Sequence, residues 1–172
     1  MSQFTFNISL SVLNHLGRNL YRSFITVLGE AISNSWDADA KNVWIYVNRD
    51  KNYLIIKDDG VGMTEDDFQN KFLKIGYSKR KNGVDKSGLQ RPFIGRKGIG
   101  KLALLSCAKR IHILTKTVNS NWIGGVIDNG GLDSAIEDDL TPQQYPLENI
   151  DISYFISLKD NLEQGTIIYF ED

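Results

Sequence analysis

Residues 24–63 read FITVLGEAISNSWDADAKNVWIYVNRDKNYLIIKDDGVGM, and this stretch decides the fold. Residues 43–47 and 53–57 are rich in β-branched and aromatic side chains, and a polar turn separates them, so they predict a β-hairpin. The apolar residues before the hairpin recur at about 100° per residue, which predicts a helix over residues 18–37. These residues are Leu20, Phe24, Val27, Leu28 and Ala31. The stretch therefore predicts a helix packed on an antiparallel sheet.

The rest of the chain continues this pattern of hairpins and short helices. Alternation predicts a strand over residues 4–10, and Thr64 followed by three acidic residues predicts a helix that runs to about residue 74. A further helix is predicted over residues 99–108, and strands over 111–118, 121–127, 152–158 and 166–170. This order indicates an α+β two-layer sandwich, with a mixed, mostly antiparallel sheet and helices on one face.

Composition bounds the classes of protein to consider. The chain has 172 residues, 41% hydrophobic and 24% charged, which is typical of one globular domain. The single cysteine, Cys107, excludes an internal disulfide, and with only two histidines a zinc site is not expected. No apolar run approaches the ~20 residues of a membrane helix, and the N-terminus lacks the features of a secretory signal. We therefore expect a cytoplasmic protein without a membrane partner.

Three polar residues form a stripe on the predicted helix. Glu30, Asn34 and Asp37 are spaced i, i+4 and i+7, so they project from one face, beside the apolar arc. A carboxylate next to a carboxamide is suited to a general base beside a Mg²⁺ ligand. The alternative is an ordinary solvated helix face.

A second polar group follows the strand of residues 53–57. Alternation places Asp58 on the same face as the apolar Leu54 and Ile56, where a carboxylate needs a hydrogen-bond donor. Gly60 and Gly62 allow unusual dihedral angles and the close approach of a flat ligand. The alternative is a plain hairpin turn, in which Asp-Gly is common.

A third motif, GRKGIGK, occupies residues 95–101 and opens a predicted helix, whose free N–H groups can bind phosphate. It is not a P-loop, because Leu102 stands where the Mg²⁺-binding hydroxyl is required, and its glycine order also differs from the dinucleotide fingerprint. Gly165-Thr166 begins the last predicted strand. Between Lys71 and Lys101 there are ten basic residues and one acidic residue, although the whole chain carries a net charge of −1.

Together these motifs resemble those of the GHKL superfamily. It includes gyrase B-type topoisomerases, heat-shock-90-type chaperones, MutL mismatch-repair proteins, histidine kinases and microrchidia-type ATPases. The matching segments are EAISNSWDA (30–38, the N-box), DDGVGM (58–63), GRKGIG (95–100) and Gly165-Thr166, so the resemblance covers about residues 18–170. It implies the Bergerat fold, with residues 76–97 as a long, basic ATP lid.

The resemblance also implies roles for individual residues. Glu30 would be the general base that activates water, and Asn34 would hold Mg²⁺. Asp58 would accept a hydrogen bond from the adenine amino group, supported by Thr166. The implied nucleotide-binding residues are Asn34, Asp37, Asp58, Gly60, Gly62, Met63, Lys79, Arg96, Lys97, Gly98, Ile99, Gly100, Lys101 and Thr166; the basic ones are candidate phosphate contacts.

The implied function is Mg²⁺-dependent hydrolysis of ATP to ADP and phosphate, with lid closure and homodimerisation of a longer protein. The domain would span residues 1–172, with 1–17 as an N-terminal strand or strap to a partner and 128–149 as a surface insertion. A γ-phosphate-binding lysine from a following domain is expected beyond Asp172, so turnover by the fragment should be slow. The client, nucleic acid or protein, stays open.

Two alternatives to hydrolysis remain. Histidine-kinase-type domains generally begin the N-box with Asn, so Glu30 favours hydrolysis over phosphotransfer to protein. A non-hydrolysing nucleotide-sensing or dimerisation module is the other alternative.

Overall fold

The computed structural model describes residues 4–6, 24–74, 85–94, 108–130 and 145–172. Its strands are β1 (Thr5–Phe6), β2 (Val43–Asn48), β3 (Tyr53–Asp58), β4 (Arg110–Lys116), β5 (Ile123–Asp128), β6 (Tyr145–Pro146) and β7 (Gly165–Glu171). Its helices are α2 (Phe24–Asp37), α3 (Glu65–Asp67), the π-helical turn η2 (Phe68–Phe72), the 3₁₀ turn η3 (Ile152–Phe155) and α6 (Ile156–Lys159).

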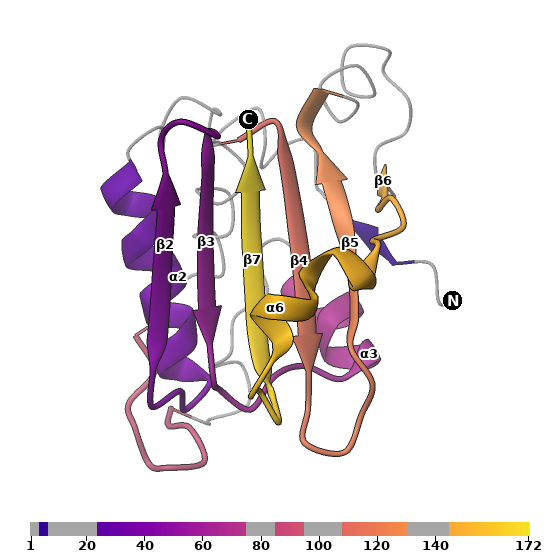
Figure 1. Ribbon diagram of the computed structural model, residues 1–172. Coiled ribbons are helices and arrows are strands. Elements are labelled where there is room, and N and C mark those ends of the chain that lie inside the picture. The colour runs from indigo at the N-terminus through magenta and orange to yellow at the C-terminus, as the bar shows by residue number, and fades with distance from the viewer. Residues whose placement is uncertain (1–3, 7–23, 75–84, 95–107, 131–144) are drawn as a thin grey trace, which may run out of the picture.

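The main sheet has the strand order β2-β3-β7-β4-β5, and all its pairings are antiparallel (Figure 1). The last strand, β7, therefore lies in the centre of the sheet, between β3 and β4. The predicted hairpins 43–57 and 111–127 are confirmed as β2–β3 and β4–β5. This order brings the end of β3, the end of β4 and the start of β7 to one edge of the sheet, because both neighbours run antiparallel to β7.

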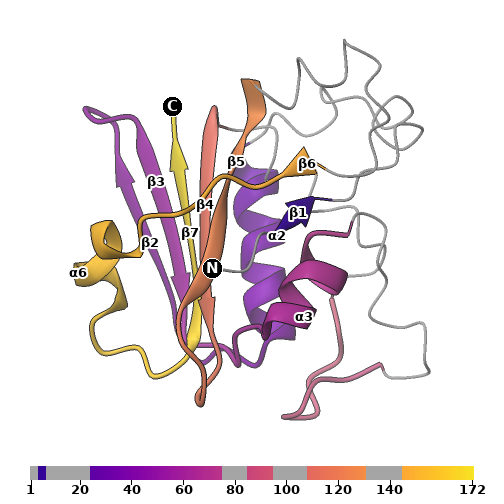
Figure 2. The ribbon, with the colours of Figure 1, turned by 90° about the vertical axis from the view of Figure 1, so that its right-hand side faces the viewer.

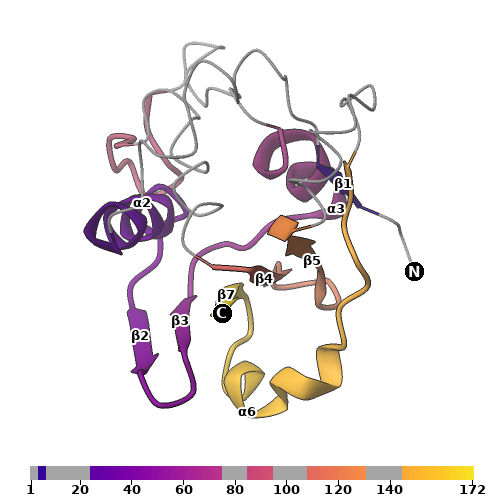
Figure 3. The same cartoon turned by 90° about the horizontal axis from the view of Figure 1, so that it is seen from above.

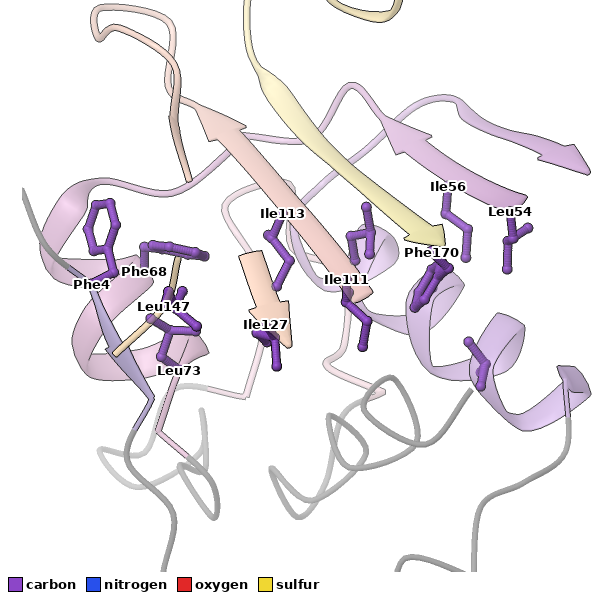
Figure 4. Packing of buried hydrophobic residues seen from close by; sticks show 13 residues of the cluster. Phe4, Leu54, Ile56, Phe68, Leu73, Ile111, Ile113, Ile127, Leu147 and Phe170 are labelled. Carbon is purple, nitrogen blue, oxygen red and sulfur yellow. The ribbon is translucent and has the colours of Figure 1, made fainter. Parts of the chain in front are cut away.

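Helices α2 and α3 cover one face of the sheet, as Figures 2 and 3 show. Alternation along β3 directs Leu54 and Ile56 to this face, where they join one core cluster with Val27 and Ala31 of α2. Figure 4 shows the same cluster continuing to Phe68. The two-layer α+β architecture is thus confirmed, with the amphipathic α2 packed on the sheet as its spacing predicts.

The opposite face is covered by η3 and α6, and here one prediction is wrong. Residues 152–158 were expected to form a strand, but they form these two short helical turns. Asp151 caps the first turn by accepting the N–H of Ser153 at 2.9 Å. A second core cluster lies on this face and includes Ile55, Leu114, Ile167 and Tyr169 of the sheet. The apolar side chains Ile152, Phe155 and Leu158 recur every three residues and pack with it. The same segment also alternates like a strand, because Ile152, Tyr154, Ile156 and Leu158 are each two residues apart.

The helix predicted to start at Thr64 is confirmed at its cap. The Thr64 hydroxyl accepts the N–H of Asp67 at 3.1 Å, and the helix passes into a π-helical turn that buries Phe68. At the N-terminus β1 pairs with β6, and Phe4 packs edge-on against Phe68 at 4.8 Å between ring centroids. The rest of the predicted strand 4–10, residues 18–23 and the helix 99–107 lie outside the described residues, as do 131–144 of the expected insertion. None of the described helices is long and apolar enough to cross a membrane.

Candidate functional site

The N-box and the first glycine motif meet at one edge of the sheet. The C-terminal end of α2 lies beside the end of β3, near the start of β7 (Figure 1). The N–H of Val61 donates to the carbonyl of Ala38 at 2.9 Å, and the Ser35 hydroxyl donates to Asp58 at 2.9 Å. Two motifs that are separate in the sequence therefore share hydrogen bonds in the fold.

Asp58, at the end of β3, is buried, with 8% of its surface exposed. One carboxylate oxygen accepts the N–H of Gly60 at 2.9 Å, and the other accepts the Ser35 hydroxyl. Burial raises the pKa of Asp58, while the hydrogen bonds from Gly60, Ser35 and the Thr166 backbone oppose that rise. A carboxylate has about four acceptor positions. The described residues supply three donors, so among them one acceptor position of Asp58 has no partner and could take a ligand donor.

The neighbouring acid, Asp59, has a different task. Its carboxylate accepts the backbone N–H groups of Lys41 and Asn42 at 2.7 and 2.8 Å and the Asn42 side chain at 2.8 Å. Although partial burial acts in the opposite sense, these hydrogen bonds hold the pKa of Asp59 below its usual value. Asp59 therefore fixes the chain before β2, and Asp58 is the acid that fits a ligand.

The two glycines of this motif are required for different reasons. Gly62 has φ +68°, and a Cβ there would lie 2.0 Å from the carbonyl oxygen of Lys116. Gly60 does not have the unusual dihedral angle that the sequence suggested. Glycine is needed at position 60 for space, because a Cβ there would lie 2.8 Å from the carbonyl oxygen of Ala38. Both positions exclude a side chain, so the backbone of residues 60–62 packs directly on α2 and β4.

Thr115 of β4 joins the strands beneath the site, and sequence reasoning missed it. Its hydroxyl is fully buried, accepts the N–H of Met63 at 3.0 Å and donates to the carbonyl of Gly165 at 3.1 Å. The hydroxyl of Thr166 lies 3.2 Å away, and Thr166 is the β7 partner of Asp58. Thr115 lies on the same face of β4 as Ile111 and Ile113. A hydroxyl on an otherwise apolar strand face needs a buried partner, and this pattern could have identified Thr115 from the sequence.

Ser35 was missed for the same reason. It is 2% exposed and lies four and eight residues after Ala31 and Val27, on the apolar stripe of α2. Its hydroxyl lies 3.1 Å from the carbonyl of Ala31 as well as donating to Asp58. A lone serine on an apolar stripe points to a specific partner, because a buried hydroxyl needs one.

Glu30 and Asn34 lie one turn apart on α2, and both are half-buried. Partial burial raises the pKa of Glu30, and the negative charge of Asp37 adds to this. A carboxylate with a raised pKa is a stronger base near neutral pH. The described residues hold no group of three or more His, Cys, Asp or Glu side chains that could bind a metal. A Mg²⁺ ion here would use few protein oxygens, for which the Asn34 amide is suited.

Asp37 is buried, with 7% of its surface exposed, and accepts the N–H of Ile94 at 2.8 Å. The structure thus assigns it a contact with residues 85–94, the described part of the expected lid. Seven other predicted nucleotide-binding residues lie outside the described residues. They are Lys79, Arg96, Lys97, Gly98, Ile99, Gly100 and Lys101.

Comparisons with known proteins agree with this geometry. Residues 21–151 match the family described as histidine kinase-, DNA gyrase B-, and HSP90-like ATPase. The chain is 34% identical over 155 residues to the Putative type II restriction enzyme HgiDII of Herpetosiphon aurantiacus, covering 88% of this chain and 24% of that protein. It is 27% identical over 146 residues to the mitochondrial TNF receptor-associated protein 1 homolog of Dictyostelium discoideum, covering 72% of this chain and 20% of that protein.

A third relative is the endoplasmin homolog of Leishmania donovani, 24% identical over 106 residues, which are 57% of this chain and 14% of that protein. The chain spans between 14% and 24% of the length of these three relatives.

Proposed function

The chain belongs to the histidine kinase-, DNA gyrase B- and HSP90-like ATPase family, and we propose that it performs Mg²⁺-dependent ATP hydrolysis as the switch of a larger protein. The observation that carries the proposal is the buried Asp58 at the edge where α2, β3 and β7 meet. ATP and water are the substrates, and ADP and phosphate the products.

Adenine selection is the task of Asp58. Its remaining acceptor position is complementary to the amino group of adenine, whereas guanine presents a carbonyl oxygen at the corresponding position. Gly60 lies beside this acid, and a Cβ there would come within 3.0 Å of an Asp58 carboxylate oxygen, so glycine keeps side-chain atoms away from the acceptor. Thr115 and Thr166 hold the surrounding strands in register, and Met63 shares this network.

Hydrolysis is the task of Glu30. Its raised pKa suits it to take a proton from the attacking water at neutral pH. The proton passes to the Glu30 carboxylate, the water oxygen bonds to the γ-phosphorus, and ADP leaves. Glu30 lies on the same helix as Ser35, whose hydroxyl donates to Asp58. Recognition of the adenine ring and activation of water therefore depend on one helix, α2.

Mg²⁺ would neutralise the phosphate charge when bound. Asn34 would supply its protein ligand, and phosphates and water the others. The same proposal includes the candidate phosphate contacts of the lid and the second glycine motif, which are Lys79, Arg96, Lys97, Gly98, Gly100 and Lys101, and the nucleotide-binding candidate Ile99. Lid closure over ATP and dimerisation of the larger protein complete it.

The test compares wild type with Glu30→Gln in ATP binding and in steady-state phosphate release. We expect unchanged affinity for ATP and a loss of turnover of about 10²- to 10⁴-fold, the usual contribution of a general base. Equal turnover in the two proteins would refute hydrolysis through Glu30 and favour a nucleotide-sensing module. Transfer of the γ-phosphate to a protein histidine would favour the histidine-kinase alternative.

The HgiDII similarity gives a second candidate setting, in which the ATPase domain serves a protein that acts on DNA. It is supported by the coverage of 88% of this chain, which is more than the 72% of the TNF receptor-associated protein 1 homolog. We expect double-stranded DNA to stimulate ATP hydrolysis by the full-length protein. No stimulation would leave the chaperone-like setting.

A further inference from the structure

Residues 85–94 form a small hairpin of their own. Lys86 and Pro92 form an isolated antiparallel bridge, and the N–H of Phe93 donates to the carbonyl of Asp85 at 2.9 Å. The N–H of Ser87 donates to the carbonyl of Arg91, also at 2.9 Å. The hairpin therefore keeps its shape through its own backbone, and its attachment to the domain is a separate question.

The end of α2 and the residues just after it hold this hairpin. The Asp39 carboxylate accepts both the Ser87 hydroxyl and the N–H of Leu89, the latter at 3.0 Å. Asp37 accepts the N–H of Ile94 at 2.8 Å. Two acids that follow Asn34 thus bind the turn and the C-terminal end of one segment about 50 residues away in the chain.

Trp36 and Arg91 add a third attachment. The Arg91 guanidinium lies over the Trp36 ring, 4.7 Å from its centroid, and donates to the carbonyl of Ala40 at 2.7 Å. The Trp36 indole N–H donates to the carbonyl of Pro92 at 3.0 Å. Guanidinium stacking on an indole face is favourable in addition to the hydrogen bonds.

This attachment is polar and separate from the cores. Neither of the two described core clusters contains a residue of 85–94, and Leu89 and Ile94 are 57% and 52% exposed. Removing one polar contact should therefore loosen the hairpin without opening a core. The attachment can be tested by substitution in an otherwise folded domain.

We propose that Asp39 and Trp36 are positioning residues, which hold the 85–94 hairpin on α2 and so strengthen binding of the phosphate end of an adenine nucleotide. This rests on the proposed function. Ile94, whose N–H donates to Asp37, directly precedes in the sequence the motif of residues 95–100 that the proposed function assigns to phosphate binding. Trp36 lies on the helix that carries Glu30 and Asn34, and Asp39 lies two residues after the end of that helix.

The test variant is Asp39→Gly. Asp39 has φ 60°, which glycine adopts without strain, so the change removes the carboxylate alone. We expect ATP affinity to fall roughly tenfold, as for loss of charge-assisted hydrogen bonds, while adenosine affinity changes less than about twofold. Amide hydrogen exchange of Leu89 should accelerate in the same variant. Asp39→Asn should restore both, because its amide can still serve Ser87 and Leu89.

Asn161→Gly is the matched control, because Asn161 also has a positive φ, 64°, and follows α6 on the opposite face. It should leave ATP and adenosine affinity unchanged. Equal losses of ATP and adenosine in Asp39→Gly would overturn the inference, since they indicate general damage to the site. Unchanged ATP affinity despite faster exchange would overturn it as well. Absence of adenosine and ATP binding by the wild type would overturn the proposed function and this inference with it.

Discussion

Replacing Asp58 with Asn should abolish adenine selection while leaving the fold intact. In the wild type, both carboxylate oxygens accept hydrogen bonds, from Gly60 and Ser35. The side-chain oxygen of the introduced asparagine can still accept the N–H of Gly60. Its NH₂ group can donate to the Ser35 hydroxyl oxygen, and that hydroxyl can donate in turn to the carbonyl of Ala31, 3.1 Å away. Because burial raises the pKa of Asp58, the buried charge weakens the fold at neutral pH. The variant should therefore unfold at the same temperature as wild type or higher.

The loss of binding follows from the changed hydrogen-bond pattern. The second amide hydrogen of the introduced asparagine would face the adenine amino group, so a donor meets a donor. Loss of a hydrogen bond to a charged group is worth about 1.5–3 kcal/mol, which is about 10- to 150-fold in Kd. Calorimetric titration of Mg²⁺-ATP into wild type and Asp58→Asn measures this change. ATP affinity within twofold of wild type, with the variant folded, would refute the role of Asp58.

Asp59→Asn is the control for this prediction. One Asp59 oxygen accepts the backbone N–H groups of both Lys41 and Asn42. The side-chain oxygen of an asparagine can accept the same two hydrogen bonds, so the chain before β2 should keep its position. We expect this variant to retain its preference for ATP. If Asp59→Asn lost ATP as strongly as Asp58→Asn, the division of tasks between the two acids would be wrong.

Three further predictions concern stability. Gly62→Ala should lower the free energy of unfolding by at least about 1–3 kcal/mol, because its Cβ would collide with the last carbonyl of β4; an unchanged urea midpoint would contradict this. Thr115→Val should lower it by about 1–3 kcal/mol, since the Met63 N–H loses its acceptor, and Thr115→Ser should recover most of the loss in the same urea titration. Burial lowers the pKa of His112, although the hydrogen bond to Glu171 opposes this. The free energy of unfolding should therefore be highest above pH 6.5 and should decline as the pH falls through the lowered pKa, and His112→Gln should lack this decline in unfolding curves measured at a series of pH values.

The sequence predicted the helix-on-sheet architecture because its signals are local. The apolar stripe of α2 and the alternation of β3 each lie within one element, and the face of Asp58 followed from that alternation. Strand order could not be predicted, because insertion of β7 between β3 and β4 depends on pairing across the whole chain. Residues 152–158 were misassigned as a strand, because Ile152, Tyr154, Ile156 and Leu158 alternate along the sequence as in a strand.

At the site, the prediction was strongest for residues that form motifs. Asp58 and Thr166 lie opposite each other, since β3 and β7 pair in register at this edge, and their roles toward a nucleotide stay a prediction. The supporting hydroxyls of Ser35 and Thr115 were missed, because their partners come from other elements. The contact of Asp37 with residues 85–94 likewise depends on how that hairpin docks on α2.

The most direct test of the central claim is calorimetric titration of Mg²⁺-ATP and Mg²⁺-GTP into the wild-type domain. A nucleotide site in which Asp58 accepts the adenine amino group should bind ATP at least roughly tenfold more tightly than GTP, since guanine has no amino group at the matching position. Equal affinity for the two nucleotides, or binding of neither, would contradict the assignment of this sheet edge as an adenine-nucleotide site.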